Sequence, residues 1–217
     1  LVKIDERSGR LNYNYYKQSR LKPVSCLLLA FLLTTGRRLK EAGTLTWARY
    51  KPGEYPRIEL EKTKTSKKNN KLVFKLGDEA VNILNLISID RLNNPSSAFY
   101  FPINDPRNNY IFPSRTYGKK VKGGKSKVLY VQDPGATWNK VLRLGGVERH
   151  MKIHSTRHSF ATNFYRVTKD LKALAEALGT TEAQASKYAK LDGEPVVEGI
   201  NKIKFFDDEK PTLKQVN

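Results

Sequence analysis

The longest apolar run of the chain, Cys26–Leu33, lies within Val24–Thr34, a stretch that is apolar on nearly all sides. This pattern is typical of a helix that is buried on every face, with Pro23 suited to its first turn and Gly36 to its end. Asp78–Ile89 carries apolar residues at helical spacing and predicts an amphipathic helix. A helix that crosses a membrane needs about 20 apolar residues, so no membrane span is predicted.

Other stretches predict further helices; these are Arg38–Trp47, Pro134–Gly145, Arg157–Thr168, Leu171–Leu178 and Ala183–Leu191. Two β-forming stretches, Arg57–Leu60 and Leu72–Leu76, flank a polar turn and predict a hairpin or a small antiparallel sheet. Residues 90–132 are rich in Pro, Asn and Gly and predict irregular structure, with a mobile basic loop at Arg115–Lys127. The pattern as a whole indicates an α+β fold that is mostly helical.

The polarity of the chain also suggests its organisation. Residues 1–22 are polar, basic and Tyr-rich, and we interpret them as a linker or a loosely attached arm. Residues 23–191 contain no further linker and predict one domain. Residues 192–217 are more acidic than the rest of the chain and predict a short helix followed by a tail.

Composition narrows the class of partner. The chain of 217 residues has 40 Lys and Arg against 21 Asp and Glu, a formal net charge of +19. Such an excess points to a polyanion, above all nucleic acid, because we find no basic amphipathic helix with an aromatic face that would suit a membrane surface. One Cys and three His exclude a disulfide framework and a Cys-rich zinc module. A reducing compartment, the cytoplasm or nucleoid of the host cell, is expected.

The segment Thr35–Trp47 places Arg38 after a glycine and near a helix N-terminus, where backbone N–H groups and a guanidinium can hold an anion together. Glu41 follows three residues later and can orient Arg38 across one helical turn. The alternative is a solvated basic turn with a local ion pair.

A second segment, His154–His158, contains two histidines and an arginine. Helical spacing brings His154 and Arg157 to one face, where an imidazole can move protons and a guanidinium can neutralise phosphate oxygens. His154 and His158 have the spacing of a metal pair, but two ligands are too few, so no metal is predicted. We expect His158, which precedes an apolar run, to be a buried and hydrogen-bonded histidine.

Two further residues could carry chemistry. Lys64 lies where the first β-stretch enters its turn, although a hairpin lysine often serves only solubility. Tyr188 lies in a helical stretch with small and polar neighbours, which leave its phenol space; most helical tyrosines, however, belong to an apolar core.

The order and spacing of these segments resemble the tyrosine recombinases, also called phage integrases. Thr35–Trp47 resembles their Thr-Gly-x-Arg-x-x-Glu box, and Lys64 lies at the position of their hairpin lysine. His154–His158, followed by Phe-Ala-Thr, resembles their second box. Leu178-Gly179 resembles the dipeptide before the nucleophile, and Tyr188 lies where that nucleophile is expected. The resemblance covers about residues 20–190.

The resemblance implies a tyrosine-recombinase catalytic domain that cleaves and rejoins DNA strands through a 3′-phosphotyrosyl intermediate. Tyr188 would be the nucleophile, Arg38 and Arg157 would hold the phosphate oxygens, His154 would assist proton transfer, and Lys64 would protonate the leaving oxygen. Supporting roles fall to Glu41, His158 and Thr180. No nucleotide cofactor is implied, because the covalent bond conserves the energy of the phosphodiester. No metal is implied either, because two guanidiniums, a lysine and an imidazole would serve the phosphate.

The expected partners are double-stranded DNA and further copies of this chain in a tetrameric synapse, with no membrane. Basic side chains of two strips are expected to contact phosphates unless they are only solvated surface: Lys62, Lys67, Lys68, Lys71, Arg115, Lys119, Lys120 and Lys122. By analogy with the family, residues 192–217 would dock on a neighbouring subunit; the alternatives are a helix folded back on its own domain and a disordered end. Integration or excision of a viral or mobile element is the expected role.

Two departures from the family pattern leave alternatives open. Thr180 occupies the position where the family has His or Trp, and the interval to Tyr188 is one residue shorter than usual. Residues 1–22 are too short to form the DNA-clamping domain that precedes the catalytic domain in this family, which suggests a catalytic fragment or a short recombinase. The alternatives are a catalytically weak or inactive DNA-binding module of the same fold and a type IB topoisomerase-like enzyme that relaxes DNA.

Overall fold

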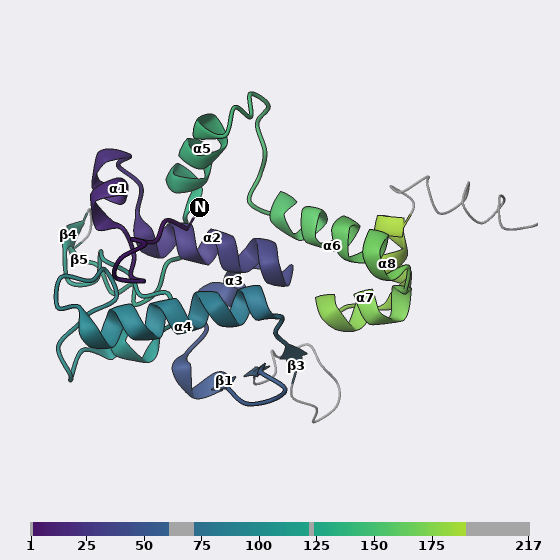
Figure 1. Cartoon of the computed structure of the whole chain (residues 1–217), viewed down its shortest axis with the longest axis horizontal. Helices are drawn as coiled ribbons and strands as arrows, with labels where there is room; N and C mark the ends of the chain where they lie inside the picture. Colours follow the sequence, from purple (N-terminus) through teal and green to yellow (C-terminus); the bar gives the residue numbers. More distant parts are fainter. Residues whose placement is uncertain (1, 61–71, 122–123, 190–217) are drawn as a thin grey trace, which may run out of the picture.

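The computed structural model describes residues 2–60, 72–121 and 124–189, which form a mostly helical domain with a small sheet (Figure 1). The helices of the described residues are α1 (Tyr13–Gln18), α2 (Pro23–Thr35), α3 (Leu39–Gly43), α4 (Asp78–Asn93), α5 (Gly135–Leu144), α6 (Ser155–Thr168), α7 (Leu171–Leu178) and α8 (Glu182–Ala189), with 3-10 turns at Trp47–Arg49 and Pro106–Asn109. The strands are β1 (Tyr50–Lys51), β2 (Arg57–Leu60), β3 (Leu72–Lys75), β4 (Lys120–Val121) and β5 (Gly124–Lys125). In these three ranges no helix is both long and apolar enough to cross a membrane.

Helix α2 is the centre of the main hydrophobic core, as its all-round apolar pattern predicts. The side chains from Cys26 to Leu29 have no exposed surface, and neither do Phe31 and Leu32. Helix α4 lies alongside α2 (Figure 1) and buries an apolar face that includes Leu84 and Ile87. The predicted amphipathic helix is therefore confirmed, and it continues four residues past its expected end, to Asn93.

The predicted hairpin is confirmed and belongs to a three-stranded antiparallel sheet in the order β1-β2-β3. Ile58 on β2 pairs with Phe74 on β3, and both side chains are buried against the main core. Strand β1, which the sequence analysis did not predict, pairs with β2 through Tyr50 opposite Ile58. This sheet carries the segment that leads towards Lys64, which itself lies outside the described residues.

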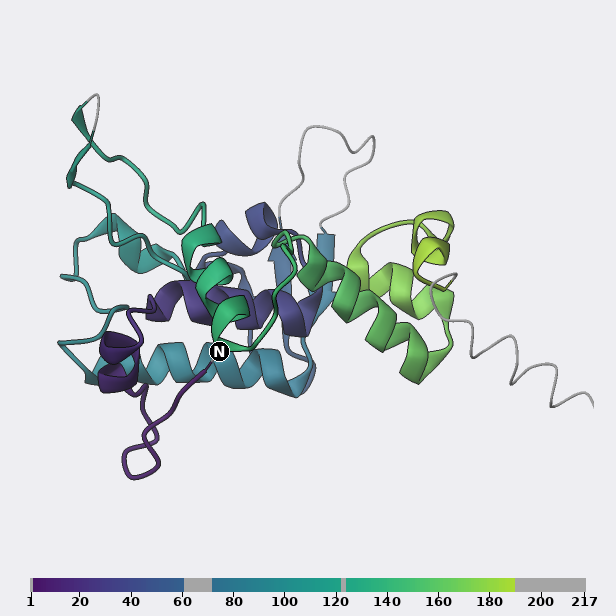
Figure 2. The same ribbon diagram turned by 90° about the horizontal axis from the view of Figure 1, so that it is seen from above.

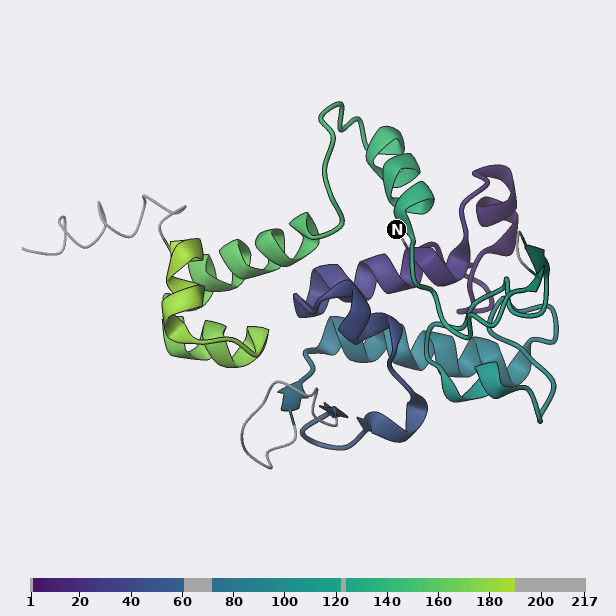
Figure 3. The ribbon, with the colours of Figure 1, turned by 180° about the vertical axis from the view of Figure 1, so that it is seen from behind.

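Helices α6, α7 and α8 form a separate unit at one end of the body (Figures 2 and 3). They surround a second, small hydrophobic cluster whose buried members are Ala161, Leu174, Ala175, Leu178 and Ala185. The connection from α5 to α6 has no helix or strand of its own. The C-terminal unit is joined to the body by contacts of α6 with α2 and of α7 with β3, which include an ion pair between Lys75 and Glu176.

Gly36 lies in close contact with the C-terminal unit. It ends α2 in the left-handed conformation, with φ +62°, and its N–H donates to the carbonyl oxygen of Leu32. A Cβ atom at this position would lie 2.9 Å from Cδ2 of Leu178 and would overlap the ring of Phe160. Only glycine suits both the backbone conformation and the contact.

The interpretation of residues 1–22 as a loose arm is wrong for the part after Leu11. Leu11, Tyr16 and Leu21 are buried in the main core. The Tyr13 hydroxyl donates to Oδ2 of the fully buried Asp90 over 2.6 Å, and burial raises the pKa of Tyr13. Tyrosine-rich sequence here indicates amphipathic packing, because each ring is buried while its hydroxyl finds a polar partner.

Two other expectations need correction. The helix predicted over Arg38–Trp47 ends at Gly43, because the chain turns there so that the Leu45 carbonyl accepts a hydrogen bond from Ile111 N–H. A Cβ on Gly43 would lie only 2.8 Å from the Val131 carbonyl oxygen, which shows how closely the neighbouring segment passes. The basic stretch expected as an irregular loop contains the antiparallel pair β4–β5, with Lys120 opposite Lys125.

Replacing Gly36 by Ala should destabilise the protein by about 2–4 kcal/mol, since left-handed strain adds to a steric clash with Phe160 and Leu178. Gly118→Ala is the control: Gly118 also has a positive φ, +74°, but a Cβ there meets nothing within 4 Å. It should lose only about 1 kcal/mol. Urea unfolding of both variants measures the difference; equal losses would show that Gly36 is not a close contact between the units.

Candidate active site

Arg38 and Glu41 form the part of the site that the body supplies. Arg38 precedes α3, and its Nη1 donates to Oε1 of Glu41 over 2.8 Å. The backbone N–H of Arg38 donates to the other carboxylate oxygen over 3.3 Å. The Arg38 side chain remains 50% exposed, so Glu41 orients a guanidinium that still faces solvent, as the spacing predicts.

The beginning of α6 supplies the second part of the site. His154 lies immediately before this helix, and Arg157 and His158 lie in its first turn. Arg157 is buried; its Nη1 donates to the Gly36 carbonyl over 2.8 Å, and its Nη2 donates to the Leu178 carbonyl over 3.2 Å. A guanidinium has five N–H donors, so these two bonds orient Arg157 and leave donors for another group.

Tyr188, on α8, completes the cluster. Its ring centroid lies 5.4 Å from that of His158, which in turn lies 4.9 Å from that of His154 in an edge-to-face arrangement. Tyr188 is half-buried and contacts the small hydrophobic cluster. The expectation that His158 is buried is wrong: it is exposed, because it lines a surface pocket.

The electrostatics of the cluster favour a neutral imidazole at His154. Burial lowers the pKa of His154, and the neighbouring His158, Arg157 and Arg38 lower it further. Burial and Arg38 also lower the pKa of Arg157, whereas the Tyr188 phenol raises it by charge interaction and hydrogen bonding. Residues far apart in sequence therefore act on one another, which places Arg38, His154, Arg157 and Tyr188 around one site.

The threonines before α8 have local hydrogen-bond partners. The Thr180 hydroxyl donates to the side-chain oxygen of Gln184, and Thr181 Oγ1 accepts from the Gln184 backbone N–H over 3.3 Å. The second bond is that of a helix N-cap. Thr180 lies at the turn next to Leu178-Gly179, and its oxygen lone pairs, rather than its proton, remain for a further contact.

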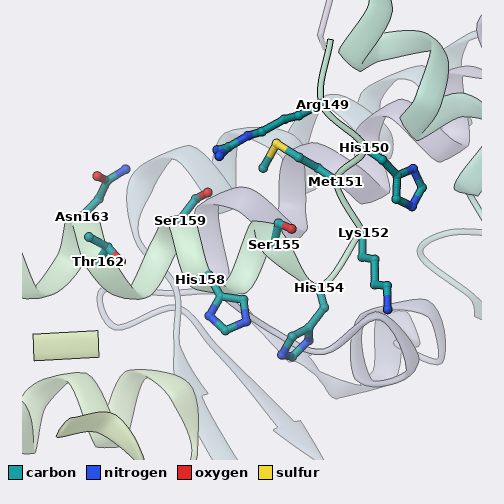
Figure 4. Close-up of a pocket in the computed structure, with 10 residues that line it drawn as sticks. All are labelled: Arg149, His150, Met151, Lys152, His154, Ser155, His158, Ser159, Thr162 and Asn163. Carbon is teal, nitrogen blue, oxygen red and sulfur yellow. The ribbon is translucent and has the colours of Figure 1, made fainter. Parts of the chain in front are cut away.

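A surface pocket of about 750 Å³ opens beside the two histidines (Figure 4). The imidazoles of His154 and His158 project from the same side of the first turns of α6. The rest of the lining comes from the segment before α6 and from its polar face: Arg149, His150, Met151, Lys152, Ser155, Ser159, Thr162 and Asn163. The lining has positive charge and hydroxyl donors and contains no carboxylate, which suits an anionic ligand.

Three basic residues that the sequence did not single out also contribute to this region. Arg149 and Lys152 line the pocket, and the signal for them is the cluster Arg149-His150-Met151-Lys152 just before the His154 segment. Arg37 is fully buried between the units and stacks on Phe74, with 4.1 Å from its guanidinium carbon to the ring centroid. Its signal is the unusual pair of adjacent arginines after Gly36.

Other predicted residues lie away from the cluster or outside the described ranges. Arg115, Lys119 and Lys120 are exposed at the β4–β5 end of the body, opposite the C-terminal unit (Figure 2). Arg115 has local partners there, since its guanidinium lies 5.4 Å from the Phe101 ring centroid. The remaining predicted basic residues lie outside the part of the chain that the structure describes: Lys62, Lys64, Lys67, Lys68, Lys71 and Lys122.

A metal ligand set is not formed by the described residues. Residues 2–60, 72–121 and 124–189 contain no group of three or more His, Cys, Asp and Glu side chains that could hold a metal ion. The positive groups around His154 would also disfavour a cation. The cluster suits an anion that brings its own negative charge.

Comparison of the sequence with models of known protein families identifies one family. The model of the phage integrase family matches residues 10–193. Among solved structures, the chain is similar to the XerH site-specific recombinase bound to palindromic difH substrate in a post-cleavage complex, with 18% identity and a TM-score of 0.60. It is also similar to the XerA recombinase, with 18% identity and a TM-score of 0.58, and to the Tn1549 transposon integrase in complex with circular intermediate DNA, with 15% identity and a TM-score of 0.52.

The matches cover most of this chain but only part of the other proteins. For XerH, XerA and the Tn1549 integrase they include 91%, 92% and 82% of this chain, and 55%, 65% and 59% of the other. The likeness in structure confirms the predicted fold, that of a tyrosine-recombinase catalytic domain. Curated protein sequences give no match.

The lowered pKa of His154 has a consequence for pH dependence. Below pH 6.5, the ordinary pKa of histidine, the unfolded chain takes up a proton at this position more readily than the folded one, so His154 should reduce stability as the pH falls. Removing a neighbouring charge with Arg38→Gln should raise the pKa of His154 towards its ordinary value. An NMR titration of the imidazole measures it. The control Arg166→Gln, an equal loss of charge at the far end of α6, should leave the pKa unchanged; an equal shift in both would mean that Arg38 does not face His154.

Proposed function

Because the chain belongs to the phage integrase family, we propose that it cleaves and rejoins double-stranded DNA with Tyr188 as the nucleophile. The observation that carries the proposal is the meeting of Arg38 from the body, His154 and Arg157 from α6, and Tyr188 from α8. These groups provide a nucleophile, a proton-transfer group and two fixed cations in one place. That is the set of functions that phosphoryl transfer to a tyrosine requires.

In the proposed step, the phenol oxygen of Tyr188 attacks the scissile phosphorus. A bond forms between the tyrosine oxygen and phosphorus, the bond from phosphorus to the 5′ oxygen breaks, and the phenol proton passes to the imidazole of His154. The 5′ oxygen gains a proton, for which Lys64 is the proposed donor. The reverse attack by a 5′ hydroxyl rejoins the strand, so the reaction needs neither a nucleotide cofactor nor an oxidant.

The two arginines have different environments that suit different parts of this task. Arg38 is half-exposed and is held from behind by Glu41, so it can reach a phosphate that arrives from solvent. Arg157 is buried and fixed by two backbone carbonyls, so its position changes little when a ligand binds. Preorganised cations of this kind stabilise charge that develops in a transition state without a reorganisation step.

His154 is the proposed proton-transfer group. With its pKa below the ordinary value, its imidazole is neutral at pH 7 and can accept the phenol proton or share it through a hydrogen bond. His158 lies between His154 and Tyr188 and is proposed to support the tyrosine by ring contact. Both roles are compatible with catalysis without a metal ion.

DNA binding is proposed to rest mainly on charge. The net charge of +19 favours a polyanion, and the pocket next to α6 adds Arg149 and Lys152 on the side of the two histidines. XerH and the Tn1549 integrase were both solved with DNA, which supports DNA as the partner of this chain. The affinity should therefore fall steeply with salt concentration.

Assembly and biological role follow from the same proposal. Recombination between two duplexes requires four active sites, so we propose a homotetramer on DNA, with residues 192–217 docking on a neighbouring subunit. The proposed role is integration or excision of a viral or other mobile element in the host cytoplasm or nucleoid. The integrase of the transposon Tn1549 supports a mobile element as the source of such a chain.

A second candidate, an inactive or weak DNA-binding module, is favoured by one observation. The position before Tyr188 where the family has His or Trp carries Thr180, whose hydroxyl proton is donated to the side-chain oxygen of Gln184. Both candidates bind DNA, but only the recombinase forms a covalent adduct. A nicked suicide substrate distinguishes the two candidates. After cleavage, the short strand with the new 5′ hydroxyl diffuses away, so the strand cannot be rejoined and the covalent adduct accumulates.

The variant Tyr188→Phe should bind DNA as the parent chain does and form no covalent adduct, because the attacking oxygen is gone. A denaturing gel with labelled suicide substrate measures the adduct, and it should form with the parent chain in EDTA. The control Tyr165→Phe, a tyrosine on α6 that also contacts the small hydrophobic cluster, should retain adduct formation. Loss in the control alone would assign the nucleophile to Tyr165, and failure of the parent chain to form an adduct would favour the inactive module.

Replacing Arg38 by Ala should slow cleavage at saturating DNA by roughly 100-fold or more, the order of a lost oxyanion contact. Affinity should change only a few-fold, because many other basic side chains share the binding. Single-turnover cleavage and a binding titration measure the two quantities separately. Equal losses in affinity and rate would identify Arg38 as an ordinary phosphate contact.

A further inference from the structure

Arg37 has an unusual environment for an arginine. It is 1% exposed, in the loop between α2 and α3. Its Nη2 donates to the Ala177 carbonyl, and its guanidinium stacks on the ring of Phe74. Its Nε and Nη1 have no hydrogen-bond partner.

This environment is unfavourable for stability. A buried guanidinium with two unpartnered nitrogens has lost hydration without full replacement. Burial lowers the pKa of Arg37 to about 10, Glu41 opposes that shift, and Arg157 and Arg38 add to it as like charges. An apolar side chain would fill the same space against Phe74 without this penalty, and replacing buried charges by apolar groups is often neutral or stabilising. The charge at position 37 therefore requires a reason other than packing.

The bonds of Arg37 indicate that reason, because they join the same two segments as those of Arg157. Arg37 reaches from the body to Ala177, and Arg157 reaches from α6 to Gly36 and Leu178. The carbonyls of Ala177 and Leu178 lie at the C-terminal end of α7, where helix carbonyls lack internal partners and the helix dipole is negative. Two cations therefore hold the end of α7 to the loop that carries Arg38.

The contact extends to the turn before α8. Gly179 has φ +63°, and a Cβ there would lie 3.0 Å from Nη1 of Arg37. The guanidinium plane thus lies directly against the Leu178-Gly179 turn, which is followed by the helix of Tyr188. Although Arg37 and Arg38 are adjacent in sequence, their side chains have different partners. Arg38 contacts Glu41 and solvent, and Arg37 contacts the end of α7.

We propose that Arg37 is a positioning residue that fixes the α7–α8 turn, and through it Tyr188, relative to Arg38 and Arg157. The inference rests on the proposed function in that it assigns Arg37 a part in the cleavage reaction. Arg37 does not touch the reacting atoms; it sets the distance between the nucleophile and the cations. A displacement of about 1 Å at a reacting centre is enough to slow a reaction by about two orders of magnitude.

The first test is the variant Arg37→Met, which keeps an unbranched side chain against Phe74 and removes the link to Ala177. Its melting temperature should equal or exceed that of the parent chain, and its DNA affinity should stay within about threefold. Single-turnover cleavage at saturating DNA should fall roughly tenfold or more. The control Arg166→Met, an exposed arginine at the far end of α6, should change neither stability nor cleavage. Unchanged cleavage in Arg37→Met overturns the proposal, and so does a loss that matches a fall in the folded fraction.

Chemical rescue distinguishes positioning from general destabilisation. In Arg37→Ala the missing side chain leaves a space that a guanidinium ion can occupy, so millimolar guanidinium chloride should restore part of the cleavage rate. Arg37→Met fills that space and should not respond. Equal responses of the two variants, or none in either, contradict a specific guanidinium role.

Hydrogen exchange gives a readout that does not depend on cleavage. In Arg37→Met, amides of residues 177–188 should exchange several-fold faster, while those of α4 should be unchanged. If Arg37→Met exchanges faster but the parent chain forms no DNA adduct, Arg37 does hold the α7–α8 turn, and the proposed function is wrong. Unchanged exchange at 177–188 would reject the link itself, whatever the activity of the parent chain.

Discussion

The arrangement of the candidate catalytic groups in the described part of the chain depends on the hydrogen bonds that the buried Arg157 donates to two carbonyls, one on Gly36 and one on Leu178. One carbonyl belongs to the loop before Arg38, and the other to the turn before α8. Arg157 itself lies in the first turn of α6, the helix that follows His154. A single guanidinium therefore fixes three segments that are remote in sequence, and the hydrogen bond from Arg37 to the Ala177 carbonyl repeats the connection.

These polar bonds matter because the two hydrophobic cores are separate. The body has a large core around α2 and α4, while α6–α8 enclose only a small cluster. Apolar burial of that size stabilises the C-terminal unit weakly on its own. The contact of Gly36 with Phe160 and Leu178, together with the arginine bonds, must therefore set how the unit sits against the body. The candidate active site lies at this junction, where cations from the body meet the tyrosine and histidines of the C-terminal unit.

Periodicity predicted most of the helices, including α2, α4, α5 and α7, since each carries a strong apolar pattern over two turns or more. It missed what depends on contacts distant in sequence: the burial of Tyr16, the two-residue strand β1, and the early end of α3 at Gly43. In the site, local spacing was sufficient to relate Arg38 to Glu41. The ring contact of His158 with Tyr188 and the burial of Arg37 against α7 were not predictable, because each depends on a segment more than 25 residues away.

Mapping the covalent bond between protein and DNA tests the assembled site most directly. The adduct from a suicide substrate is digested with nuclease and protease, and the peptides are sequenced by mass spectrometry. A nucleotide joined through its 3′ phosphate to Tyr188 is the predicted result, because only this tyrosine lies beside His158 and acts on Arg157 in the described part of the chain. A nucleotide on Tyr165 or on any other residue would contradict the assignment of the site to the junction between the two units.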